Sequence, residues 1–131
     1  MNAPSVDIKD MLVADTNLGL VFGQNLFISR EPSLPNDCVT IYDTPGNPDG
    51  LTMNRVERYE YPTIQVRVRN TGFVQGWAVL RKIRTSLHGR ANETWGGAYY
   101  TILRVSSGPA LLEYDQNNRV ILIMNFEIQR R

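Results

Sequence analysis

The sequence contains very few of the residues that build disulfides, metal sites and catalytic centres. Its 131 residues include one cysteine, Cys38, and one histidine, His88. A single cysteine cannot form a disulfide within the chain and cannot supply a thiolate cluster for zinc. A single histidine excludes a metal site built from several histidines, so any catalytic pair that needs an imidazole would have to use His88.

Long apolar runs and a charge excess are also missing. No stretch approaches the roughly 20 consecutive apolar residues that cross a bilayer, so we expect no contact with a membrane. Residues 1–7 lack the basic region and apolar run of a secretory signal, which predicts folding and assembly in the cytoplasm of the producing cell. The 14 basic and 13 acidic residues give a formal net charge of +1. Proteins that bind nucleic acid through its phosphates carry a marked basic excess, so this class is disfavoured, with a local basic patch left open.

The residues that are present are those of an ordinary folded domain. Hydrophobic residues make up 42% of the chain and charged residues 21%, which is normal globular usage. The length fits one domain and leaves no room for two of ordinary size. We therefore predict a single domain over residues 1–131.

Hydrophobic periodicity predicts the order helix, three strands, helix, three strands. The expected elements are a helix between Pro4 and Gly19, strands over 20–30, 38–43 and 59–69, a helix over 72–88, and strands over 98–106, 110–114 and 120–128. This order predicts an α+β fold, with a mostly antiparallel or mixed β-sheet of about five to six strands and two main helices packed on it.

Three of these segments show which side faces the core. Apolar residues alternate in the strand over 59–69 and in the last strand, and they recur at helical spacing in the helix over 72–88. The predicted core positions are Ile64, Val66, Val68, Val120, Leu122, Met124, Phe126, Ile128, Phe73, Gly76, Trp77, Leu80, Ile83 and Leu87.

Each residue with potential chemistry has a simpler structural interpretation. His88 lies at the end of a predicted helix beside Gly89, where a cation complements the helix dipole, and no serine or cysteine motif frames it. Cys38 begins an apolar strand, where a thiol packs as a small hydrophobe unless a positive neighbour activates it. Asp43, Asn47 and Asp49 lack the alternate spacing and closing glutamate of a calcium loop. We expect no catalytic, cofactor-binding or metal-binding residues.

Two features favour contact with other proteins. Arg67 and Arg69 on the polar side of a strand, with Arg81, Lys82 and Arg84 in the next helix, could form a basic surface. No aromatic residues interleave with Arg67 and Arg69, so solvation or salt bridges between subunits are favoured over nucleic acid. Residues 44–57 are expected to form a long exposed loop, and loops of this length in compact domains tend to be functional or disordered.

Several strings of the sequence resemble the minor capsid and tail terminator proteins of long-tailed bacteriophages. Residues 26–32, a Pro/Asn/Asp turn and residues 38–44 are similar to the first β-hairpin of that family. Residues 61–69 are similar to its next strand, and residues 83–89 to the end of its helix. The resemblance covers roughly residues 5–129 and rests on structural strings and not on catalytic signatures.

The resemblance implies a virion structural protein that acts by assembly and not by catalysis. It implies a homo-oligomeric ring, commonly a hexamer, at the head-proximal end of the tail tube. The ring would end tube polymerisation and join the tail to the head-completion or stopper protein of the neck. DNA would pass through its lumen without specific binding. We expect the loop over 44–57 and the face with Arg67 and Arg69 to contact neighbouring subunits or the tail tube.

Other functions remain open on the sequence. A head-completion or neck adaptor protein of similar size would form comparable rings. A small hydrolase would use His88 with a nearby acid, and a nucleic-acid binder would show steeply salt-dependent binding to DNA.

Overall fold

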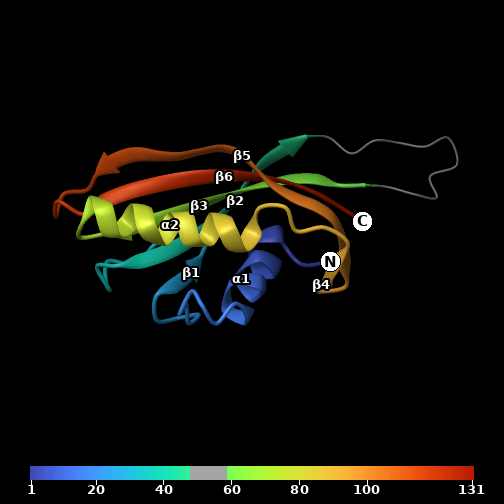
Figure 1. Ribbon diagram of the computed structural model, residues 1–131, viewed down its shortest axis with the longest axis horizontal. Helices are drawn as coiled ribbons and strands as arrows, with labels where there is room; N and C mark the ends of the chain where they lie inside the picture. The colour runs from blue at the N-terminus through green and yellow to red at the C-terminus, as the bar shows by residue number, and fades with distance from the viewer. Residues whose placement is uncertain (48–58) are drawn as a thin grey trace, which may run out of the picture.

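The computed structural model describes residues 1–47 and 59–131, which form a curled β-sheet with two helices on one of its faces (Figure 1). In chain order the described elements are α1 (Pro4–Ala14), β1 (Leu26–Ile28), β2 (Cys38–Asn47), β3 (Tyr61–Asn70), α2 (Phe73–Leu87), β4 (Glu93–Trp95), β5 (Ala98–Tyr114) and β6 (Val120–Arg130). The predicted α+β class is confirmed. Each helix is followed by three strands, as predicted, but the first two strands after α2 are not the ones expected.

The sheet is mixed, and its strands lie in the order β1-β2-β3-β6-β5-β4. Only the β1–β2 pair is parallel among the described strands; the other pairs are antiparallel. One row of residues crosses five strands, because Leu26 pairs with Val39, Val39 with Val68, Val68 with Leu122 and Leu122 with Leu111. Along this row, Leu26 on the β1 side of the sheet lies at the same height along the strands as Leu111 on the β5 side.

The core lies between the sheet and the helices. The alternating residues of β3 and β6 point into it as predicted, with Ile64, Val66, Val68, Val120, Leu122, Met124, Phe126 and Ile128 all buried. On α2 the buried residues are Gly76, Leu80, Ile83 and Leu87. Phe73 was expected on this buried side but is 43% exposed, because it lies in the first turn of α2, at the margin of the core.

Gly76 sets the distance between α2 and the sheet. A Cβ atom at this position would lie 3.1 Å from Asn70 Cβ and 3.2 Å from Leu122 Cδ1. Contacts this short leave no space for a larger side chain, so the glycine allows the helix to pack closely over β3 and β6.

The strings that resemble a β-hairpin do not form one. A hairpin requires antiparallel strands, and β1 runs parallel to β2, so that prediction was wrong. The connection over residues 29–37 instead returns along the sheet face that the helices leave uncovered. Arg69 fixes it there by donating hydrogen bonds to the carbonyl oxygens of Pro35 (2.7 Å) and Asn36 (3.2 Å).

Several predicted boundaries also moved. The first helix ends at Ala14 and not near Gly19, and the strand expected over 20–30 shrinks to β1. The strands expected over 98–106 and 110–114 are one strand, β5, whose pairing with β6 shifts register around Gly108. The segment before β5, predicted to be an irregular connection because of its polar residues, contains the short strand β4.

The predicted loop over 44–57 is wrong for residues 44–47, and residues 48–57 lie outside the described part of the chain. Thr44 pairs with Thr63 and Asn47 with Tyr61, with a register shift between these pairs. A Cβ atom at Gly46 would lie 2.2 Å from the carbonyl oxygen of Tyr61, so a glycine permits this close approach. Residues 45–46, which favour a turn in isolation, therefore lie inside β2 because the flanking residues pair with β3.

The helix α1 is attached to the sheet through its first turn. Asp43 of β2 accepts hydrogen bonds from the Ser5 backbone N–H (2.9 Å) and from the Ser5 hydroxyl (2.7 Å). The first N–H groups of a helix have no partner within it, so a carboxylate from another element can cap them. Asp43, considered above as a calcium ligand, is used for this cap.

A buried polar cluster joins α1 to the last strands. Asp7 is fully buried and accepts hydrogen bonds from the Tyr100 hydroxyl and from Arg130 (3.3 Å). Arg130 also pairs with Glu60 at 2.9 Å. Burial, together with the hydrogen bond to Asp7, raises the pKa of Tyr100 well above its usual range, so the phenol stays protonated and donates.

Candidate assembly surfaces

His88 lies at the end of α2 and connects this helix to β5. It is the C-cap residue of α2, and its backbone N–H donates to Arg84 O at 2.8 Å. Its ring Nδ1 accepts a hydrogen bond from the Val105 N–H at 3.0 Å. The imidazole thereby links the end of α2 to β5.

Cys38 is buried, as expected for core packing, with 4% of its surface exposed. Burial is the main cause that raises the pKa of its thiol, so the reactive thiolate is disfavoured. Within residues 1–47 and 59–131, no group of three or more His, Cys, Asp or Glu side chains is arranged to hold a metal ion.

Arg67 and Arg69 are paired within the chain, which corrects the prediction of arginines available to a neighbouring subunit. Arg69 is 4% exposed, and its NH1 lies 3.4 Å from Glu31 Oε1. Arg67 lies 4.0 Å from Glu31 Oε2 and stacks over the ring of Tyr42. Because Glu31 belongs to the 29–37 connection, these arginines stabilise that connection against the sheet.

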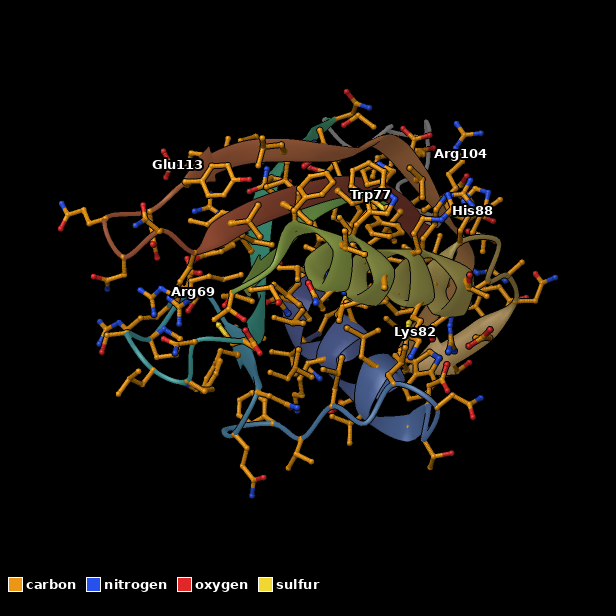
Figure 2. All side chains as sticks on the ribbon, turned by 60° about the vertical axis from the view of Figure 1, so that its left-hand side comes forward. Arg69, Trp77, Lys82, His88, Arg104 and Glu113 are labelled. Carbon is orange, nitrogen blue, oxygen red and sulfur yellow. The ribbon has the colours of Figure 1, made fainter. Side chains whose placement is uncertain are left out.

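The five basic residues do not form one surface. Arg67 and Arg69 lie on the face of β3 opposite to Val66 and Val68, which face the helices. Arg81, Lys82 and Arg84 belong to α2, on the other side of the sheet. Figure 2 shows Arg69 near one end of the sheet and Lys82 toward the C-terminal end of α2. The basic surface considered above is therefore divided between the two sides of the molecule.

The sheet face without helices, called here the open face, is polar, and hydrogen bonds and ion pairs between side chains connect its strands, although the buried Thr40 Oγ1 and Arg67 Nε have no hydrogen-bond partner among the described residues. Gln65 donates to Asn125 at 3.1 Å, and Asn125 donates to Ser107 at 2.7 Å, so one hydrogen-bonded chain crosses β3, β6 and β5. Arg104 pairs with Glu127 on the same face. Such a face offers hydrogen-bonding groups but little unpaired charge.

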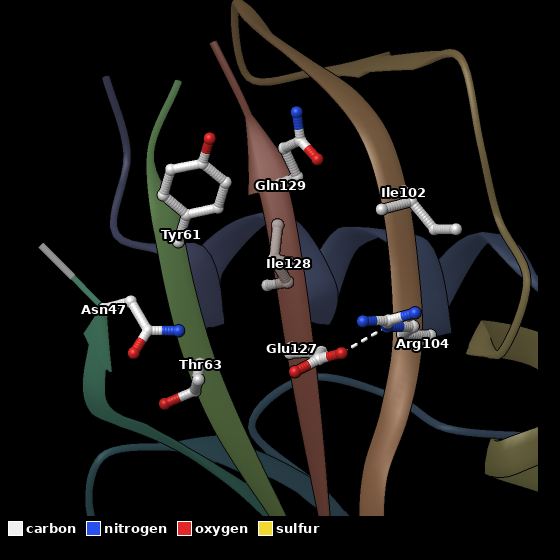
Figure 3. A pocket seen from close by; sticks show the side chains of 8 residues that line it. All are labelled: Asn47, Tyr61, Thr63, Ile102, Arg104, Glu127, Ile128 and Gln129. Atoms are coloured by element: carbon white, nitrogen blue, oxygen red, sulfur yellow. Dashed lines mark hydrogen bonds and ion pairs between the residues drawn. The ribbon is translucent and has the colours of Figure 1, made fainter. Parts of the chain in front are cut away.

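One end of the open face is hollowed. A cavity of about 270 Å³ is bordered by Asn47, Tyr61, Thr63, Ile102, Arg104, Glu127, Ile128 and Gln129 (Figure 3). The carboxylate among these residues, Glu127, is paired with Arg104. Among the residues that the structure describes, this lining includes neither a histidine nor a cysteine.

Exposed apolar side chains gather at the outer side of β5, where the sequence analysis did not place a site. Leu111 is 47%, Leu112 44% and Tyr114 56% exposed. Phe73 and Trp77 of α2 stack with ring centroids 5.7 Å apart, and Figure 2 shows Trp77 on the side of the helix toward β5. The consecutive apolar residues 110–112 break the alternation of a half-buried strand, which is the sequence signal that could have revealed them.

The structure is a two-layer α+β fold with a polar open face and apolar residues along one edge, a surface typical of proteins that contact other proteins. Among the described residues, no helix is long and apolar enough to cross a membrane. No curated protein matches the chain.

The family model described as "Bacteriophage tail terminator protein" matches residues 9–131, so the chain belongs to the bacteriophage tail terminator family. It is a structural protein of the virion tail. This confirms the resemblance seen in the sequence.

Six chains of solved structures match the fold. One, from the "Virion of native gene transfer agent (GTA) particle", has a TM-score of 0.71 and 13% sequence identity. The alignment covers 98% of this chain and 94% of that chain. At this identity the likeness shows that the two chains share a fold over nearly their whole length.

Proposed function

We propose that the protein is a single-domain tail terminator that forms a homo-oligomeric ring, commonly six copies, at the head-proximal end of the tail tube. The ring ends polymerisation of the tail tube protein and joins the tail to the stopper or head-completion protein of the neck. The observation that carries this proposal is the match to the tail terminator family over residues 9–131.

The surfaces of the chain support an assembly role without catalysis. His88 is engaged with Val105, and Cys38 is buried with its thiol pKa raised by that burial. The exposed apolar side chains of β5 and α2 are the kind that protein partners cover.

Charge pairing supports a lumen through which DNA passes without being bound. On the open face Arg104 is paired with Glu127, and Arg67 and Arg69 with Glu31. Cations paired within the chain are poor ligands for phosphates, because binding would require breaking the existing ion pair. The net charge of +1 agrees with such a passage.

Addition of the purified protein to polymerising tail tube protein tests the terminator function. We expect tubes of reduced length, with a ring of this protein at one end seen by negative-stain microscopy. Mass measurement of the protein alone and bound to tubes gives the number of copies. Tubes of unchanged length without an end-bound ring would overturn the proposal.

Two comparisons separate this function from its alternatives. Headless tails should carry the protein, whereas a neck adaptor would remain with the heads. The His88→Ala variant should still cap tubes, because a ring component needs no base; a loss of function with the fold retained would favour the hydrolase hypothesis instead.

A further inference from the structure

The outer edge of β5 is only partly covered. β4 pairs with residues 98–100 of β5, and Arg90 and His88 contact Leu103 and Val105. From Ser106 to Tyr114, no strand among the described residues lies on this outer side. An uncovered strand edge with exposed apolar side chains is a surface that another protein chain covers.

We call this surface the β5-side patch and define it as Phe73, Trp77, Leu111, Leu112 and Tyr114. Its two parts lie on elements that both adjoin β6: a Cβ at Gly76 of α2 would lie 3.2 Å from Leu122 and 3.6 Å from Val120. Leu122 and Val120 pair with Leu111 and Tyr114 on β5. Phe73 and Trp77 flank Gly76 on the helix and extend the patch from the strand onto α2.

A second apolar surface lies at the opposite edge of the sheet. Val21 and Phe22 are each 47% exposed. Phe22 is bridged to Leu26 of β1, so these residues lie directly outside the β1 edge. We call this pair the β1-side patch.

The two patches lie at the ends of the same row. Leu26, beside the β1-side patch, and Leu111, within the β5-side patch, end the row through Val39, Val68 and Leu122. A contact between the patches of two copies therefore places neighbouring sheets level, without a shift along the strands. Rotation without such a shift closes a ring, whereas a shift would generate a helical filament.

Strand direction agrees with this arrangement. β5 runs antiparallel to β6, and tracing the pairs through β3 and β2 makes β5 antiparallel to β1. Copies related by rotation about a ring axis parallel to the strands keep their strand directions. The edges that meet would then be antiparallel, the commoner arrangement of neighbouring strands.

We propose that the occupant of the β5-side patch is the β1-side patch of a second copy of this chain, in a head-to-tail contact repeated around the ring. This inference rests on the proposed ring and names its subunit interface. Each copy uses two different surfaces, so the contact is heterologous and differs from a two-fold dimer.

Cysteine cross-linking tests the contact directly. In a Cys38→Ala background, Leu112→Cys and Phe22→Cys are made as separate proteins. Mixing them and adding a short thiol cross-linker should give a covalent dimer as the main product, whereas each protein alone should remain uncross-linked. The double variant should give a ladder ending in a closed ring. Ile102→Cys, on the open face and 38% exposed, is the matched control that should not cross-link with Phe22→Cys.

The outcomes separate this inference from the ring itself. If the wild-type protein forms no ring in solution or on tail tubes, the proposed function fails. If it forms a ring and the mixed variants do not cross-link within it, only this interface is wrong. Covalent dimers from Leu112→Cys alone would indicate a two-fold contact and would also overturn the inference.

Discussion

Asp7 shows how one residue can hold distant parts of the chain together. Its carboxylate bonds to Tyr100 of β5 and Arg130 of β6, and Asn2 donates to its other oxygen at 3.2 Å. Gly96 lies so close that a Cβ there would be 2.3 Å from Asp7 Oδ1. The cluster is closely packed on all these sides, so loss of the carboxylate would leave buried donors without a partner.

We predict that Asp7→Ala lowers the free energy of unfolding by about 3 kcal/mol, because removing one partner leaves Arg130 buried and incompletely paired. Asp10→Ala is the matched control on the same helix. Asp10 pairs with Lys9, its side chain is 44% exposed, and the expected loss is below about 1 kcal/mol. Urea unfolding of both variants measures the difference, and equal losses would contradict a structural role for the cluster.

At the scale of elements, the position of α2 depends on Gly76. A glycine inside a helix costs about 1 kcal/mol relative to alanine, so its presence here requires a packing reason. The short distances to Asn70 and Leu122 supply that reason. The helix packs closely over β3 and β6, and Figure 2 shows Trp77 on the side of the helix toward β5.

We predict that Gly76→Leu lowers the free energy of unfolding by about 2 kcal/mol, since the new side chain would have to displace α2 from the sheet. Ala78→Leu makes a comparable change at an exposed position of the same helix, and its effect should stay within about 0.5 kcal/mol. Thermal or urea unfolding distinguishes them. A stable Gly76→Leu protein would show that the helix can move without cost.

At the scale of the whole molecule, the nature of the exposed edges decides how copies would associate. Arg104 and the arginines of β3 have acidic partners in the same chain, whereas the β5-side and β1-side patches consist of apolar residues, with Lys9 over the ring of Phe22 in the second patch. Association through these patches would depend on burial of apolar surface and little on ion pairs between subunits.

We therefore predict that the ring keeps its mass when NaCl is raised from about 0.1 M to about 1 M, a change that shortens the screening length from about 10 Å to about 3 Å. Sedimentation velocity at both concentrations measures this. Leu112→Ser should weaken association equally at low and high salt. Dissociation of the wild-type ring by salt alone would show that ion pairs hold the subunits together.

The sequence predicted those parts of the fold in which local pattern and tertiary environment agree. The alternation of β3 and β6 appears unchanged in the structure, because each strand has one side on the core. The prediction from sequence was wrong where pairing between strands outweighed the conformational preference of the local residues. Pro45 and Gly46 favour a turn, yet they continue β2. The register of β2 against β3 shifts at these residues, and β1 pairs only with residues 39–41, so no β1 hydrogen bond is lost at Pro45.

The candidate surfaces were harder to predict than the fold. Arg67 and Arg69 appeared free because their partner, Glu31, lies in a connection whose path across the open face no periodicity reveals. The β5-side patch combines residues from α2 and β5 that are about 40 positions apart, and only the packing of α2 at Gly76 brings them together.

By itself the sequence determined the α+β class, the approximate places of both helices and of β2, β3 and β6, the core side of the clearest strands, and the shortage of catalytic and metal-binding residues. These follow from composition and short-range periodicity, which are properties of neighbouring residues. The tertiary structure decided that β1 is parallel to β2, that the arginines are paired, and that the apolar edges share one row. Those features depend on which distant strands pair, and pairing energy is gained only when the whole sheet is assembled.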